Sequence, residues 1–326
     1  MRAMIVAAGL GTRLLPLTKL LPKPALPVRG VPLVAYQLAL LRDHGVREVA
    51  INVHHLAGAL EAAAERWCPP GLALRFSRER ELLGTGGGIA RLADFLRESE
   101  PSVVIGGDML LDFDLGGLAD WHRAGGHAAS LLLREDPRAA RFGTIGVDRE
   151  GRVRRVASRF DLGGESRAGV YAWANVLSPR IFDSLPARPA FNHLDDWWAP
   201  ELARGADDIR GLVADAKSCL WEPVGTPAEY LAANLSLRRL SFMDLDEATS
   251  RAGARVLRDA AGAPSVVLGA GARLAEDVKL TRAVVWEGER VPPGFRGDGG
   301  VFAGGAWHAC GPAEAQAAAA AGSAAP

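Results

Sequence analysis

The sequence has no excess of either charge, few cysteines and no long apolar run. Its 326 residues include 38 basic and 38 acidic side chains. Proteins that bind nucleic acids or membrane surfaces need a basic excess to hold phosphates, so this balance argues against both partners. No stretch approaches the roughly 20 apolar residues that a transmembrane helix requires. We therefore expect neither a nucleic acid nor a membrane among the partners.

The three cysteines lie far apart and show no metal-ligand spacing: Cys68, Cys219 and Cys310. An odd number of cysteines without a secretory signal indicates a reducing, cytoplasmic environment. The apolar start of the chain is too short for a signal peptide, because glycine interrupts it at once. The length, with 48% hydrophobic residues, predicts one large α/β unit and a smaller appendage.

The first two dozen residues carry the strongest signal. An apolar run from Met4 to Ala8 predicts a buried strand, and Gly9-Leu10-Gly11-Thr12-Arg13 follows directly. Glycines let the backbone approach a ligand closely, and successive N–H groups in a turn can bind an anion. Arg13 offers a planar fork for phosphate oxygens, and Lys23, flanked by prolines, offers a compact charge. A lone glycine turn fits a simple chain reversal equally well, but strand, turn and cations together favour a phosphate or nucleotide site.

The order G-x-G-T-R-x-x-P-x-T, followed by P-K-P, resembles the signature of the sugar-1-phosphate nucleotidyltransferases, the nucleoside-diphosphate-sugar pyrophosphorylases. Leu83 to Gly88 resembles their L-G-T-A-G segment, with Gly86 at the usual alanine. Gly106-Gly107-Asp108 matches their G-D motif, and Leu220 to Pro227 resembles W-x-D-I-G-T-P. The resemblance spans about residues 1–240, and its glycine spacing disfavours a dinucleotide oxidoreductase.

Apolar periodicity supports an α/β fold for this region. It predicts helices over 32–44, 58–67 and 89–96 and strands over 48–53 and 72–76. Such alternation is typical of parallel strands with helices on both faces. Together with the resemblance, it implies a Rossmann-like mixed sheet in a nucleotidyltransferase domain over 1–240.

The resemblance implies that a sugar-1-phosphate attacks the α-phosphorus of a nucleoside triphosphate, GTP or UTP being favoured, and releases pyrophosphate. Arg13 would hold the departing pyrophosphate, Lys23 would offset charge on the α-phosphate, and Asp108 would hold Mg²⁺. An aspartate after a strand can also cap a helix, but its place in the motif favours the metal role. The residues expected to bind the nucleotide are Ala8, Gly9, Leu10, Gly11, Thr12, Gly84, Thr85, Gly86 and Gly107.

The chain departs from the family at the second metal ligand. Pro223 stands where the family has an aspartate, and Glu222 comes one residue early. On a strand Glu222 would face the opposite way, unless a bulge at Pro223 re-aims it to the metal. Otherwise Asp108, nucleotide phosphates and water would hold the ion, as Mg²⁺ tolerates. A nucleotide-binding regulatory subunit that has lost catalysis is the alternative, and the intact cation set favours an enzyme.

The sugar side of the site is less complete. Gly143 and Gly169 match family glycines that line the sugar, and Asn192 is a further candidate. The lysine that contacts the sugar phosphate in the family has no counterpart, although Arg159 or Arg167 can supply charge.

Two pairs of adjacent aromatic residues each have more than one possible role. His54 and His55 follow a predicted strand at the ligand-bearing edge, but a shared metal is disfavoured because adjacent side chains diverge. Trp197 and Trp198 can stack on a sugar or belong to the core or a lid.

The C-terminal quarter has a different pattern. Small and apolar residues recur every six positions from Val266 and from Leu268, which is typical of a hexapeptide β-helix. We expect a linker over 241–263, a short left-handed β-helix-like segment over 264–312 and a disordered, alanine-rich tail over 313–326. The repeats suffice for a cap or for a contact in a homo-oligomer.

Overall fold

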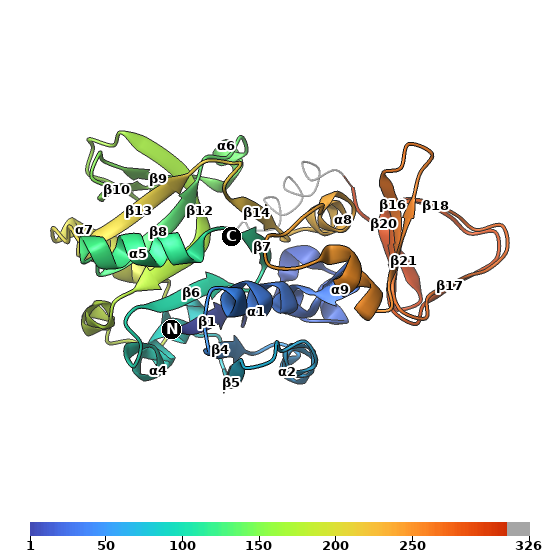
Figure 1. Cartoon of the computed structure of the whole chain (residues 1–326), viewed down its shortest axis with the longest axis horizontal. Helices are drawn as coiled ribbons and strands as arrows, with labels where there is room; N and C mark the ends of the chain where they lie inside the picture. Colours follow the sequence, from blue (N-terminus) through green and yellow to red (C-terminus); the bar gives the residue numbers. More distant parts are fainter. Residues whose placement is uncertain (312–326) are drawn as a thin grey trace, which may run out of the picture.

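The computed structural model describes residues 1–311, and its largest element is a mixed sheet of ten strands. These strands are β1 (Arg2–Val6), β4 (Glu48–Val53), β5 (Ala73–Arg78), β6 (Ser102–Gly106), β8 (Ala129–Arg134), β9 (Ile145–Val147), β10 (Val153–Val156), β11 (Phe160–Asp161), β12 (Arg167–Leu177) and β13 (Ile209–Ala214). Four parallel strands, in the order β6-β1-β4-β5, form one half, and β12 runs antiparallel beside β6 (Figure 1). The remaining strands extend the sheet beyond β12.

Helices cover both faces of this sheet, as the alternating pattern predicts. They are α1 (Leu33–Asp43), α2 (Ala57–Arg66), α3 (Gly84–Arg91), α4 (Ala93–Arg97), α5 (Leu115–Gly125), α6 (Ala139–Phe142) and α7 (Ala199–Ala203). A further helix, α8 (Pro227–Ser236), packs instead against the C-terminal strands. Because side chains alternate along a strand, Ala3 and Ile5 of β1 pack in one core cluster with α1 and α2. Met4 points into the other cluster, with α3 and α4.

The helix expected over 89–96 differs from the structure. It begins five residues earlier, at Gly84, and breaks at Leu92 into α3 and α4. The other predicted helices and strands of the first half appear within two residues of their expected bounds. The glycines between Gly84 and Gly88 therefore form the first turns of α3. At Gly84 and Gly86 the missing side chain allows close contact with Phe191.

A second, two-stranded sheet joins distant parts of the chain. It pairs β7 (Met109–Asp112) with β14 (Leu220–Pro223) in an antiparallel register without a shift. The bulge considered at Pro223 is therefore absent from this pairing. A hairpin of β2 (Pro27–Val28) and β3 (Val31–Pro32) leads from the first motif into α1.

The C-terminal strands form a five-stranded sheet at one end of the molecule (Figure 1). They are β15 (Arg255–Arg258), β16 (Pro264–Leu268), β18 (Lys279–Val285), β20 (Arg296–Ala303) and β21 (Ala306–Ala309). β16, β18 and β20 are parallel, and β17 (Arg273–Leu274) pairs in parallel with β19 (Arg290–Val291). The segment expected as a linker contains β15 and α9 (Leu245–Arg251). The expected tail over 313–326 lies outside the described residues.

The six-residue repeat is not confirmed over this sheet. Val266 pairs with Ala283, and Ala283 pairs with Gly300, so each strand follows its neighbour after 17 residues. Because 17 is not a multiple of six, the pattern loses phase between strands. Val266 packs inside the C-terminal cluster, whereas Val284 packs toward Tyr230 of α8. None of the described helices is long and apolar enough to cross a bilayer.

Candidate active site

A cavity of about 270 Å³ opens at the carboxyl ends of β1 and β6. In open α/β sheets this edge is the usual place for a ligand. The cavity draws together segments that lie far apart in the sequence, from the first motif to the turn before α8. Its lining residues are Val6, Ala7, Gly9, Gly11, Thr12, Arg13, Lys23, Pro24, Thr85, Gly106, Asp108, Trp173 and Gly225.

The glycine turn after β1 forms one wall of the cavity. Gly11 adopts a left-handed conformation with φ of 64°, and a Cβ there would lie 2.8 Å from Thr18 Cγ2. The Thr18 hydroxyl donates to the Gly11 carbonyl at 3.0 Å, and His55 Nε2 donates to the Thr18 carbonyl at 2.8 Å. His54 bonds the Glu79 carbonyl instead. Neither histidine lines the cavity, and His55 supports the turn through its bond to Thr18.

Lys23 and Asp108 form an ion pair on the cavity wall. Lys23 Nζ lies 2.6 Å from Asp108 Oδ2, with side-chain exposures of 10% and 41%. A short 3-10 turn, Lys23–Ala25, directs the lysine inward, and Val224 N–H donates to the Asp108 carbonyl at 3.1 Å. The structure thus brings together two of the three predicted catalytic residues.

Arg13, the third predicted catalytic residue, is exposed on a 3-10 turn and also lines the cavity. Its guanidinium Nη2 lies 3.3 Å from the point that a Cβ on Gly225 would occupy. The same point is 3.0 Å from Glu229 Oε2, which accepts the Gly225 N–H. A side chain at position 225 would therefore displace both charged groups.

The predicted nucleotide-binding residues divide into two groups. Gly9, Gly11, Thr12 and Thr85 lie on the cavity wall. The cavity lining does not include the others, which are Ala8, Leu10, Gly84, Gly86 and Gly107. Gly107 joins the strand ends, since its N–H donates to the Val6 carbonyl at 2.8 Å.

The glycine helix α3 packs against residues that the sequence did not link to it. Gly86 and Gly87 N–H groups donate to the Phe191 carbonyl at 2.9 and 3.2 Å. A Cβ on Gly86 would overlap the Phe191 ring, which explains glycine at the position where alanine is usual. Thr85 bonds His193 Nδ1 at 2.7 Å, and burial lowers the pKa of His193 to about 3. This ring is therefore neutral at ordinary pH.

A buried polar chain connects the glycine turn to α3, and sequence reasoning missed it. Asn52 Oδ1 accepts the Ala7 N–H at 2.7 Å, and its Nδ2 donates to Glu79 Oε1 at 2.8 Å. Glu79 Oε2 accepts the Leu83 N–H at 3.1 Å. The available signal was Asn52 itself, a polar residue inside an otherwise apolar strand. Such satisfied networks fix the relative positions of the elements that they join.

The three predicted sugar-binding residues do not line the cavity. Gly169 lies within β12, where a Cβ would approach Arg134 N at 2.9 Å, so close strand packing explains the glycine. Asn192 caps the π-helix His193–Trp198 by accepting the Leu194 N–H at 2.9 Å. Gly143 ends α6 with φ of 74°. Their contact with a sugar stays a prediction.

The other candidates for the sugar side are engaged elsewhere. Arg159 pairs with Asp195 at 3.0 Å, and Arg167 pairs with Glu135 at 2.8 Å. Trp197 and Trp198 are each 1% exposed, so their core role is confirmed and the sugar-stacking alternative is wrong.

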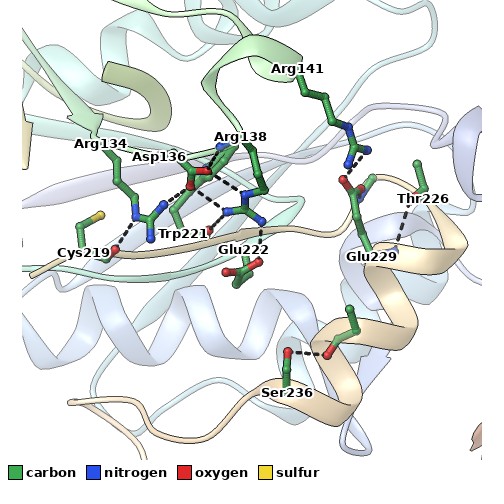
Figure 2. A network of polar contacts seen from close by, with 12 residues as sticks. Arg134, Asp136, Arg138, Arg141, Cys219, Trp221, Glu222, Thr226, Glu229 and Ser236 are labelled. Carbon is green, nitrogen blue, oxygen red and sulfur yellow. Dashed lines mark hydrogen bonds and ion pairs between the residues drawn. The ribbon is translucent and has the colours of Figure 1, made fainter. Parts of the chain in front are cut away.

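Glu222 belongs to a network of arginines and carboxylates (Figure 2). Its Oε2 accepts a hydrogen bond from Arg138 at 2.9 Å. Arg138 and Arg134 both pair with Asp136, whose side chain is fully buried between them. Arg141 forms a separate ion pair with Glu229 at 2.7 Å. The role of Glu222 as a metal ligand beside Asp108 stays a prediction. In that role Glu222 would have to give up its hydrogen bond to Arg138.

Comparisons with known proteins identify the family of this chain. The family model described as Nucleotidyl transferase matches residues 2–239. A mannose-1-phosphate guanylyltransferase of Mycobacterium tuberculosis is 30% identical over 301 residues, which cover 90% of this chain and 81% of that protein. A UTP–glucose-1-phosphate uridylyltransferase of Synechocystis is 30% identical over 249 residues, which cover 72% and 62%. HddC from Yersinia pseudotuberculosis shares the fold, with a TM-score of 0.59 and 21% identity over 72% of this chain and 97% of that chain.

The chain belongs to the nucleotidyl transferase family. Within that family, the motifs and the relatives define it as a sugar-1-phosphate nucleotidyltransferase, which confirms the resemblance seen in the sequence.

Proposed function

We propose that this enzyme transfers a guanylyl group from GTP to mannose 1-phosphate and releases pyrophosphate. The cavity wall that combines Arg13, Lys23 and Asp108 carries the proposal, because it brings two cations and a carboxylate that could hold a metal ion to one place. The guanylyltransferase relative supports the choice of substrates, since its similarity extends over 90% of this chain. The uridylyltransferase relative makes UTP and glucose 1-phosphate the second candidate pair.

The reaction needs orientation and charge neutralisation more than covalent catalysis. An oxygen of the sugar phosphate forms a bond to the α-phosphorus, and the bond to the bridging oxygen breaks. The electron pair leaves with pyrophosphate, whose charge Arg13 offsets. Lys23 offsets the charge at the α-phosphate. Backbone N–H groups of Leu10, Gly11 and Thr12 would hold phosphate oxygens in the glycine turn.

We propose Asp108 as the protein ligand of a magnesium ion. Its carboxylate lines the cavity, and Lys23 contacts one of its two oxygens. Mg²⁺ keeps several waters and is often held by one or two carboxylates plus substrate phosphates, so a single aspartate fits. The bound ion would supply further charge neutralisation at the phosphates. Within residues 1–311, no group of three or more His, Cys, Asp or Glu converges on a point.

Pyrophosphate release with Mg²⁺ tests this proposal. Purified enzyme would be combined with GTP, UTP, dTTP, CTP or ATP and with a panel of sugar 1-phosphates. We expect the fastest release with GTP and mannose 1-phosphate, and loss of release in Asp108→Asn. If no substrate pair released pyrophosphate while nucleotide binding was intact, the result would instead support the regulatory-subunit alternative.

We also propose a cytoplasmic location and a capping role for the C-terminal sheet. The three cysteines are free, which supports a reducing compartment. Val267, Val284 and Val301 of this sheet pack in one cluster with Tyr230 of α8, which supports a cap on the nucleotidyltransferase domain. A short hexapeptide-type β-helix that joins copies into a homo-oligomer is the alternative, and light scattering after gel filtration distinguishes the two.

A further inference from the structure

Trp173 is a cavity residue to which sequence analysis gave no role. It lies on β12 opposite the end of β6, and among residues 1–311 it is the one aromatic side chain on the cavity wall. Its Cβ is 3.1 Å from the point that a Cβ on Gly106 would occupy, and Asp108 Oδ1 is 3.3 Å from that point. Trp173 therefore lies beside the carboxylate that faces the phosphates.

The backbone at Trp173 is in an unfavourable conformation. Its φ is 56°, in the left-handed region, and the pairing of β12 with β8 shifts register between Tyr171 and Asn175. A bulky residue seldom adopts this conformation, and such residues persist where the surrounding structure enforces them, often at functional sites. A glycine would satisfy the backbone without strain. The presence of tryptophan thus points to a use for its ring.

The indole is supported from within the protein. The Tyr171 ring lies 5.4 Å away at an interplanar angle of 31°, and the His193 ring lies 4.5 Å away at 56°. Tyr171 OH donates to Asn175 Oδ1 at 2.7 Å, and Thr85 bonds His193 at 2.7 Å. These bonds fix the two supporting rings, and the supporting rings fix the indole at the cavity.

The order of groups along the cavity indicates which substrate meets the indole. Arg13 lies next to Gly225, whose neighbour Val224 bonds the backbone carbonyl of Asp108, whereas the side-chain Oδ1 of Asp108 lies near Gly106 and Trp173. In phosphoryl transfer the attacking and leaving oxygens are roughly in line. If Arg13 holds the leaving pyrophosphate and Lys23–Asp108 the α-phosphate, the acceptor enters from the side of Trp173.

We propose that Trp173 is the floor of the acceptor site and that its indole stacks on the C–H face of the hexopyranose of the sugar 1-phosphate. This inference rests on the proposed function. It supplies a sugar contact where the cavity lining includes none of Gly143, Gly169 and Asn192. The contact is apolar and planar, so it selects for a pyranose ring with an unobstructed face.

The test compares Trp173→Phe, Trp173→Ala and Trp173→Gly with wild type, with Trp121→Ala as a control tryptophan on α5, outside the cavity. Steady-state kinetics would give KM for GTP and for mannose 1-phosphate separately. Calorimetry would give the affinity for GTP and GDP-mannose. We expect Trp173→Ala to raise KM for the sugar phosphate about tenfold, as loss of an aromatic contact does, with KM for GTP changed less than twofold. Trp173→Phe would recover most of the loss.

Three other results would overturn the inference. A rise in KM for GTP alone would assign the indole to the base, and equal rises for both substrates would indicate a general collapse of the site. Wild-type constants in Trp173→Ala would leave the ring without a substrate contact. Failure of the proposed function would appear differently, as absence of turnover in wild type. Calorimetry with GDP-mannose on wild type and Trp173→Ala would then still measure whether the indole binds the sugar.

Discussion

Lys23 Nζ and Asp108 Oδ2 lie 2.6 Å apart, although 85 residues separate them in the sequence. The lysine stem is buried and the carboxylate is partly open to the cavity, so the pair presents opposite charges side by side to an entering triphosphate. Phosphate oxygens would compete with Asp108 for the ammonium. In the proposed reaction, the pair would position the lysine before substrate arrives and would hold a carboxylate next to the phosphates for a cation.

Lys23→Ala should lower kcat about a hundredfold while the affinity for GTP falls much less, because its charge matters most as negative charge redistributes in the transition state. Single-turnover rates and equilibrium binding of GTP would measure the two effects. Lys19→Ala, which removes an exposed lysine of the preceding 3-10 turn, is the matched control. Equal losses in rate and affinity would show that Lys23 serves binding alone.

Pro223→Asp should strengthen divalent-metal binding to the free enzyme. Pro223 pairs with Met109, and the adjacent Val224 bonds the Asp108 backbone, so an aspartate there would add a carboxylate near Asp108. Since affinity for hard cations rises with the number of carboxylate ligands, we expect Mn²⁺ to bind about tenfold more tightly than to Pro223→Ala. Electron paramagnetic resonance of free Mn²⁺ would measure this without turnover. Equal affinity in the two variants would contradict the expected geometry.

Gly86→Ala should destabilise this protein, although alanine is usual at this position in the family. The new methyl group would overlap the Phe191 ring. Overpacking of this kind typically costs about 1–3 kcal/mol of unfolding free energy. Urea denaturation of Gly86→Ala, Phe191→Val and the double variant would form a cycle. The prediction requires that Gly86→Ala be better tolerated in the Phe191→Val background, and additive effects would refute the clash.

His193 should make stability depend on pH in the mildly acidic range. Burial lowers its folded pKa to about 3, below its usual value near 6.5, so the unfolded chain binds the proton more readily. The stabilisation is complete above pH 6.5 and is lost as pH falls toward 3, by about 1.4 kcal/mol per pH unit. Denaturant titrations between pH 7 and 4.5 should show a shallower decline for His193→Gln than for wild type. If the unfolding free energies of wild type and His193→Gln declined in parallel with falling pH, the folded pKa of His193 would not be lowered by burial.

The glycine turn shows how well local chemistry can be read from sequence. A buried strand, two glycines and spaced cations predict a phosphate-binding turn through short-range sterics and charge, and the structure places Gly9, Gly11, Thr12, Arg13 and Lys23 on one cavity. The G-D motif likewise identified Asp108, because the end of a parallel strand lies at the ligand edge.

The sugar side shows where such reading stops. Gly143 and Gly169 matched family positions and Asn192 was a further candidate, but strand packing and helix ends account for their contacts in this fold. The presence of glycine at position 86 is explained only by its contact with the Phe191 ring, which lies 105 residues further along the chain. The β7–β14 register runs through Pro223 without a bulge, so no bulge re-aims the Glu222 side chain, which bonds Arg138.

The sequence by itself determined the family, the order of strands and helices in the first half, and the two cations on the cavity wall, Arg13 and Lys23. These follow from periodicity and from residues that act within a few positions of one another. Only the tertiary structure decided the Lys23–Asp108 pair, the Asn52–Glu79 link and the strained Trp173 at the cavity. Those relationships depend on which side chains meet across strands and helices distant in sequence, and no local pattern encodes that meeting.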